Sequence, residues 1–199
     1  MKTVLLVLAT AVLIALSGCG GAEESVDEGT VAPSAPEPAS GIVVENAFYY
    51  THVNGHQKET EMVANVLFEY EQLKTVKYQV AYIACTCRGP DVNYYSVAYV
   101  ELDKNDGSVQ ALSYDTDSTD HYTAGMYGDS TLTYQGVPAK ELFVKFREEV
   151  LIGASQDEIN AMEPMHGEVD AYTGATVTPN NAVRMLQGLF EYHNNKYSS

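Results

Sequence analysis

Three β-rich segments in the middle of the chain constrain its fold more than any other feature. The runs at 75–84, 93–103 and 109–115 carry valine, tyrosine, alanine and leucine in a pattern typical of strands. Gly89-Pro90-Asp91 marks a turn between the first two, and the Lys-Asn-Asp-Gly-Ser sequence at 104–108 is typical of a hairpin. Short connections of this kind join antiparallel neighbours. We therefore predict an antiparallel meander over this region.

The segments that precede the meander are less uniform. Residues 42–53 read as a further strand. The stretch Glu61–Leu73 favours a helix by the spacing of its apolar residues, and its valine, phenylalanine and tyrosine content favours a strand. The residues at helical spacing are Met62, Val63, Val66, Leu67, Tyr70 and Leu73. Both interpretations of this stretch stay open.

The C-terminal part of the chain predicts helices. Residues 138–153 place apolar side chains on one helical face, with Pro138 near the start and Gly153 as a stop. That face carries Leu142, Phe143, Phe146 and Val150. Ser155 and Glu158 have the spacing of a capping box, which predicts a short helix after them.

The last helix has the clearest pattern. Thr178 is the expected N-cap and Pro179 suits the first turn. The expected buried stripe consists of Ala182, Val183, Leu186, Leu189, Phe190 and His193. Strands first and helices later predict an α+β fold, an antiparallel sheet with C-terminal helices packed on it.

The first residues are typical of an export signal. Lys2 is followed by an apolar run that is too short to span a bilayer. Small residues then precede Cys19, as in a bacterial lipobox, so residues 1–18 are expected to be a lipoprotein signal peptide and Cys19 the lipidated residue. An ordinary signal peptide with an incidental cysteine is the alternative. A lipid on Cys19 would tie the protein to a membrane without spanning it.

A flexible linker and one acidic domain are expected after the leader. Residues 19–41 are rich in glycine, alanine, serine, glutamate and proline and cannot build a core, so 42–199 is the predicted single domain. The formal charge is −16, and it becomes −17 once Lys2 leaves with the leader, since 10 basic and 27 acidic residues remain. Such a surface repels nucleic acid, which excludes a nucleic-acid partner.

The stretch Asp170–Asn181, Asp-Ala-Tyr-Thr-Gly-Ala-Thr-Val-Thr-Pro-Asn-Asn, is the strongest candidate site. Gly174 permits close approach of a bulky group, and Ala175 adds no obstructing side chain. Thr176 supplies a hydroxyl just before a predicted helix, where free backbone N–H groups favour a phosphate. Asp170 is an unusual neighbour for a phosphate, and it either caps the turn or is read by a modifying enzyme. A plain polar turn before a capped helix is the alternative interpretation of the stretch.

Five residues of this stretch resemble the flavinylation motif Asp-x-x-Thr-Gly-Ala-Thr of the FMN-binding domain family. The family includes the extracytoplasmic flavin subunits of sodium-pumping NADH:quinone reductase and of the Rnf complex. It also includes lipoproteins of flavin-based extracellular electron transfer. The similarity extends from about residue 80 to 192, and the matching positions are Asp170, Thr173, Gly174, Ala175 and Thr176.

The resemblance implies a covalent cofactor. In the family, the last threonine of the motif carries FMN through a phosphoester bond that a dedicated flavin transferase makes, so Thr176 is the expected acceptor. Thr173 belongs to the pattern without a physical role that we can assign to it. Thr178 is counted with the cofactor-binding residues because it lies at the start of the predicted helix. A covalent flavin suits an exported protein, because a noncovalent one would be lost outside the cell.

The segment 117–130 is a second candidate for flavin contacts. It is rich in glycine, tyrosine and hydroxyl groups, and His121, Tyr122 or Tyr127 could stack on a flavin ring or bond to it. A surface loop with ordinary tyrosine packing explains the same composition equally well.

Cys85 and Cys87 are the only thiols left once Cys19 is lipidated, and an exported protein can form disulfides. In a straight strand their Cα atoms would lie roughly 6.5–7 Å apart, at the limit for a bridge. A structural disulfide, two buried thiols or a reducible disulfide near the flavin are the alternatives. No Cys/His set has zinc-ligand spacing, and no catalytic triad or carboxylate pair stands out.

These patterns favour a lipid-anchored flavoprotein on the extracytoplasmic face of a bacterial membrane. It would take electrons from a membrane donor and pass them to an acceptor that the sequence does not identify, as a carrier and not a stand-alone catalyst. A subunit of a larger membrane redox complex is the first alternative. A cofactor-free binding or structural lipoprotein is the second.

Overall fold

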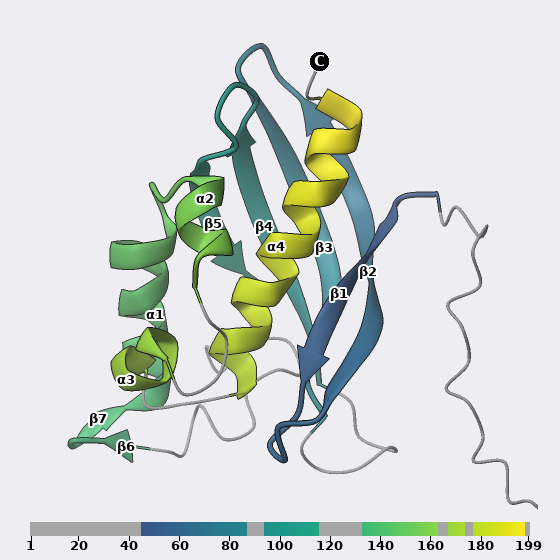
Figure 1. The fold of residues 1–199 in the computed structure, drawn as a ribbon. Coiled ribbons are helices and arrows are strands. Elements are labelled where there is room, and N and C mark those ends of the chain that lie inside the picture. Colours follow the sequence, from purple (N-terminus) through teal and green to yellow (C-terminus); the bar gives the residue numbers. More distant parts are fainter. Residues whose placement is uncertain (1–44, 87–93, 116–132, 163–166, 174–176, 198–199) are drawn as a thin grey trace, which may run out of the picture. The chain divides into compact units, whose positions relative to one another are not determined.

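A computed structural model describes residues 45–86, 94–115, 133–162, 167–173 and 177–197. Five strands form one sheet, and each strand pairs antiparallel with the next in the order β1-β2-β3-β4-β5 (Figure 1). Their bounds are β1 (Ala47–Val53), β2 (Glu59–Glu71), β3 (Thr75–Cys85), β4 (Tyr94–Asp103) and β5 (Val109–Tyr114). The predicted meander is confirmed.

Helices follow the sheet in the sequence and pack against it (Figure 1). The α+β prediction is therefore confirmed. The remaining elements are β6 (Thr133–Tyr134), β7 (Val137–Pro138), α1 (Ala139–Phe146), the π-helical turn η1 (Arg147–Leu151), α2 (Gln156–Asn160), α3 (Glu168–Thr173) and α4 (Val177–Tyr197).

The stretch Glu61–Leu73 forms most of strand β2, so its helical interpretation is wrong and its β interpretation is right. A backbone that lies between β1 and β3 forms ladder hydrogen bonds on both sides, and this outweighs the local spacing. The apparent helical period has two sources. The register shifts between Val66 and Phe68, and Leu67 and Phe68 are both 56% exposed, so apolar residues also lie on the outer face.

Helix α4 covers one face of the sheet and packs mainly on β1 and β3 (Figure 1). All six residues of the predicted stripe, Ala182, Val183, Leu186, Leu189, Phe190 and His193, are buried. The helix approaches the edge strand closely at Gly188, where an added Cβ would lie 2.5 Å from the carbonyl oxygen of Tyr49. This contact fixes the distance between the helix and β1, because a methyl group does not fit there.

The predicted helix over 138–153 is present as α1 followed by η1, and Gly153 ends it with a φ of +92°. Phe143 and Phe146 are buried as expected. Leu151 is buried as well, because the π-helical turn spaces contacts by five residues instead of four, and the predicted Val150 is partly buried against the core. The capping box of Ser155 and Glu158 is formed at the start of α2, which confirms that prediction.

Candidate functional site

The predicted flavinylation stretch lies where α3 gives way to α4, and the structure describes it up to Thr173 and again from Val177. Asp170 and Thr173 therefore lie in a helix and not in the expected turn. Helix α4 begins at Val177, so Thr178 lies inside its first turn and is not its N-cap, which corrects that prediction.

Thr173 has a structural role that the sequence did not reveal. Its side chain is fully buried, and its Oγ1 donates a hydrogen bond of 2.7 Å to the carbonyl oxygen of Val169, one turn earlier in α3. A threonine that bonds back in this way satisfies its own hydroxyl inside a packed helix. The hydroxyl of Thr173 thus belongs to the core, on the N-terminal side of residues 174–176.

Asp170 contacts the first turn of α4. Asn180 Nδ2 donates a hydrogen bond of 2.5 Å to Asp170 Oδ1. Asn180 is completely buried, whereas Asp170 is partly exposed. The bond joins the two helices on either side of residues 174–176. The expectation that Asp170 caps the turn stays a prediction, since residues 174–176 lie outside the described ranges.

Asn181 fastens the same turn of α4 to the sheet. Its Oδ1 accepts a hydrogen bond of 2.9 Å from the backbone N–H of Val53, and its Nδ2 donates to the carbonyl oxygens of Val53 at 2.9 Å and Ala84 at 3.0 Å. Val53 is the last residue of the edge strand β1, so the amide takes the place of a neighbouring strand there. One fully buried side chain thus joins α4, β1 and β3.

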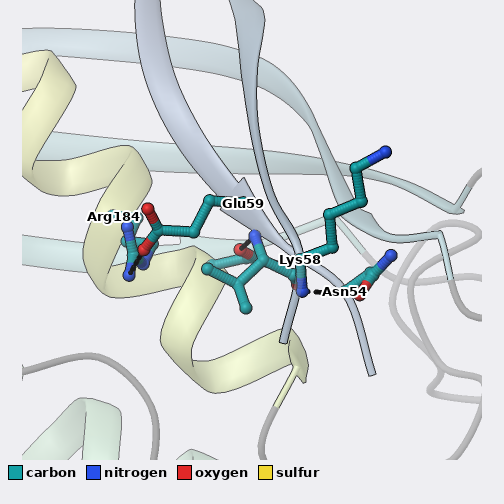
Figure 2. Close-up of polar contacts among 6 residues, drawn as sticks. Asn54, Lys58, Glu59 and Arg184 are labelled. Atoms are coloured by element: carbon teal, nitrogen blue, oxygen red, sulfur yellow. Dashed lines mark hydrogen bonds and ion pairs between the residues drawn. The ribbon is translucent and has the colours of Figure 1, made fainter. Parts of the chain in front are cut away.

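An ion pair adds a further attachment one turn along α4. Arg184 Nη2 lies 3.0 Å from Glu59 Oε1 at the start of β2, and Figure 2 shows the two side chains pointing toward each other. The β1–β2 turn beside them is closed by Asn54 Oδ1, which accepts from the N–H group of Lys58 at 3.0 Å (Figure 2). The same oxygen accepts from the N–H group of His56 at 2.9 Å. The first two turns of α4 are therefore held against one end of the β1–β2 hairpin.

His52 lies beside these attachments, on β1. It is 1% exposed, and its Nε2 has no hydrogen-bond partner among the described residues. Burial, and then the positive charge of Arg184, lower the pKa of His52 to about 4. The imidazole is therefore neutral at neutral pH and adds no charge to this region.

Cys85 lies at the end of β3 and is buried. It follows Ala84, whose carbonyl oxygen accepts the bond from Asn181. The sequence therefore places Cys85 next to a residue that contacts the first turn of α4. Cys87 lies outside the described residues, and the proposed disulfide stays a prediction.

Several predicted site residues also lie outside the described ranges. They are Cys19, His121, Tyr122, Tyr127, Gly174, Ala175 and Thr176. The leader at 1–18 and the linker at 19–41 lie outside them as well. Of the predicted cofactor residues, the structure brings Asp170, Thr173 and Thr178 together around the α3–α4 junction, on either side of 174–176.

The described residues form grooves that include two of about equal size, and neither of these is lined by predicted flavin-site residues. One, of about 350 Å³, crosses the face of the sheet opposite α4 and includes Phe68 and Tyr99. The other, of about 320 Å³, runs between the edge of β1 and α4 and includes Arg184. Cavity size alone does not identify the site.

The described residues fit a phosphate-linked group on Thr176. Helix α4 has 21 residues, and its positive end lies directly after that position. Its anchors Asn180 and Asn181 are neutral amides, so they leave that potential unchanged. Within the described ranges, no set of three or more histidine, cysteine or acidic residues could hold a metal ion. No helix among these residues is long and apolar enough to cross a membrane.

Comparisons of the chain with models of known protein families, with curated proteins and with solved structures gave no match.

Sequence reasoning missed Asn180 and Asn181 as structural anchors. One signal was available for Asn181, because Met185 and Leu189 follow it at four-residue spacing on the buried side of the helix. A polar residue in line with an apolar stripe is expected to bond to backbone groups that the helix covers. Which groups these are depends on tertiary contacts that a sequence does not display.

Proposed function

We propose that this chain is a membrane-tethered, extracytoplasmic electron carrier whose FMN is attached to Thr176 through a phosphoester bond. The observation that carries the proposal is the Asp-x-x-Thr-Gly-Ala-Thr pattern at residues 170–176, followed at once by a long helix. A flavin can pass one or two electrons, which suits exchange between a membrane donor and a second redox partner.

Helix α4 supports the proposal electrostatically. A phosphodiester on residue 176 would meet the N-terminal N–H groups of a 21-residue helix, where an anion is stabilised. The chain carries a formal charge of −16, so a local positive potential is needed to offset repulsion of the phosphate. The N-terminal end of α4 supplies such a potential.

The attachment chemistry needs an activated donor, because a free phosphate monoester does not esterify in water. A flavin dinucleotide such as FAD fits this requirement. The Thr176 oxygen would form a bond to the flavin-side phosphorus while the pyrophosphate P–O bond breaks and AMP leaves. The hydroxyl proton passes to a base of the transferase. This chain supplies the acceptor hydroxyl and its placement, and the modifying enzyme supplies the catalysis.

Intact-mass measurement of the purified chain, after coexpression with a bacterial flavin transferase, tests the proposal. We expect a mass increase of one FMN less one water, together with a fluorescent band on a denaturing gel. Both signals should vanish in Thr176→Val. They should persist in Thr133→Val, a matched change at an exposed threonine of β6. An unmodified wild-type chain under these conditions refutes the proposal and favours a cofactor-free binding or structural lipoprotein.

The same preparation separates a carrier from a subunit of a larger redox complex. A modified chain that is extracted alone in mild detergent supports the mobile carrier. A modified chain that is extracted only with other membrane subunits supports the complex.

A further inference from the structure

The hydrogen bond between Asp170 and Asn180 connects the two helices that flank the proposed acceptor segment. Asp170 lies three residues before the end of α3, and Asn180 lies three residues after the start of α4. Each residue is therefore about one helical turn away from residues 174–176. The bond, at 2.5 Å between Oδ1 and Nδ2, restrains the distance between the two ends of that segment.

Asp170 and Asn180 differ in burial, and this difference shows that Asn180 depends on Asp170 as its hydrogen-bond partner. Asn180 is completely buried, so its amide cannot exchange Asp170 for water. Asp170 is partly exposed and supplies a charged acceptor, which makes the bond stronger than one between two amides. The carboxylate of Asp170 thus has a partner inside the protein. That contact gives an acid at this position a structural role, while the carboxylate keeps its negative charge.

Asn180 itself is held in place by its neighbours. Asn181, the next residue, is tied to Val53 and Ala84 by three hydrogen bonds, so the first turn of α4 cannot shift relative to the sheet. Thr173, three residues after Asp170, is bonded to Val169 and buried. Both partners of the bond therefore lie on helical turns that have fixed attachments of their own.

We propose that Asp170 is a positioning residue that acts through Asn180, and that the pair holds the two ends of the acceptor segment at the separation that flavin transfer requires. In this role the Asp170 carboxylate accepts a hydrogen bond within the protein, and the flavin transferase does not recognise its charge. Any pair of side chains at positions 170 and 180 that forms the same hydrogen bond should therefore support flavin transfer. The inference rests on the proposed function for its flavin readout, whereas the bond itself can be tested without flavin.

An exchange of the two side chains tests the proposal. The four full-length chains are wild type, Asp170→Asn, Asn180→Asp and the double exchange Asp170→Asn with Asn180→Asp. Asp170→Asn keeps an acceptor oxygen facing Asn180, so most of the transfer rate should remain. Asn180→Asp places two carboxylates against each other, and we expect the transfer rate to fall by about tenfold or more. The double exchange restores an amide–carboxylate bond and should recover most of the rate.

Two measurements are made on each chain. The first is the initial rate of FMN addition by a flavin transferase with FAD, followed by intact mass over a range of chain concentrations to separate kcat from KM. The second is the thermal unfolding midpoint of the unmodified chain. Asn195→Asp is the matched control, because it adds the same charge at an exposed position of α4 and should change neither measurement.

The outcomes separate this inference from the proposed function. Transfer that is abolished in Asp170→Asn and not recovered in the double exchange, with wild-type unfolding midpoints, shows that the enzyme reads the carboxylate and overturns the inference. A wild-type chain that takes up no FMN refutes the proposed function instead. In that case the hydrogen bond between Asp170 and Asn180 is tested by the unfolding midpoints alone. If the double exchange unfolds at the same temperature as Asn180→Asp, the pairing of the two side chains is refuted.

Discussion

Replacing Asn181 with aspartate removes the donor group of the side chain that joins α4 to the sheet and keeps its acceptor oxygen. The carboxylate keeps an oxygen that can accept from the backbone N–H of Val53. It loses the NH₂ group that donates to the carbonyl oxygens of Val53 and Ala84 at 2.9 and 3.0 Å. Those two carbonyl groups then face a negative charge in a buried place. The substitution changes hydrogen bonding and charge with almost no change in side-chain volume.

The expected loss of stability is large. A buried polar group without a partner costs about 1–3 kcal/mol, so two such carbonyl groups cost about 2–6 kcal/mol. The free energy of unfolding of a domain of this size is about 5–15 kcal/mol in total. With a urea slope of about 2 kcal/mol per molar, the unfolding midpoint at pH 7.5 should fall by about 1–3 M. Urea titration followed by circular dichroism measures this shift.

The deficit should also depend on pH, and its sign follows from the site. Burial and the facing carbonyl oxygens favour a protonated carboxyl, so the pKa of the introduced aspartate is raised in the folded state above its unfolded value of about 3.9. The folded variant therefore binds a proton more tightly than the unfolded chain. Its deficit relative to wild type is fully present above the raised pKa and shrinks as the pH falls toward the unfolded value.

Two further variants of α4 complete the experiment. Asn195→Asp adds the same charge at an exposed position and should shift the midpoint by little at either pH. Asn181→Leu removes donor and acceptor together, and its deficit should be equal at pH 7.5 and pH 4.5. If Asn181→Asp unfolds with the same midpoint as Asn195→Asp at pH 7.5, the three-bond anchor is wrong and the start of α4 is attached in some other way.

Three other substitutions test neighbouring parts of the structure. Gly188→Ala should lower the thermal midpoint by up to about 8 °C, since overpacking costs about 1–3 kcal/mol, helix propensity returns at most about 1, and each kcal/mol shifts the midpoint of a domain of this size by about 2–4 °C. The pKa of His52, lowered to about 4 by burial and by Arg184, predicts stability that is full above about pH 6.5 and declines by up to about 3 kcal/mol toward pH 4. His52→Leu should flatten that decline in urea titrations across the same pH range. Ser155→Ala breaks the capping box with Glu158 and should cost about 1 kcal/mol of unfolding free energy in the same assay, with no effect on FMN addition.

The sheet and the last helix could be predicted from the sequence because their signals are local. The hairpin sequence at 104–108 fixes the pairing of β4 with β5, and the six-residue stripe of α4 is buried as its spacing indicates. Strand β2 is an element whose secondary structure could not be predicted from local sequence patterns alone. Its outer face carries apolar residues such as Leu67 and Phe68, which produced a false helical period that only pairing with β1 and β3 could overrule.

The candidate site was predictable in its chemistry and less so in its architecture. The motif identifies Asp170 and Thr173 as candidate site residues, but it does not show that they lie in helix α3. A helix of six residues is too short for its apolar residues to show a helical period. The start of α4 was placed two residues late, since Thr178 and Pro179 each suit a helix start and Val177 does not. The partners of Asn181 are more than 90 residues away in the chain, beyond any pattern in its own segment.

The anchors Asn180 and Asn181 are uncharged, and this matters for the phosphate that we propose on Thr176. A lysine or an acid could have fastened α4 to the same backbone groups, but either would change the potential at the helix end where a phosphate is expected. Asparagine satisfies donor and acceptor at once and adds no charge, as Asn181 does with Val53. Arg184 pairs with Glu59, and Asp170 accepts from the neutral amide of Asn180 and keeps its negative charge. In a chain with a formal charge of −16, the N-terminal end of α4 is a local source of positive potential. A charge at Asn181 should therefore weaken flavin attachment even where the fold survives.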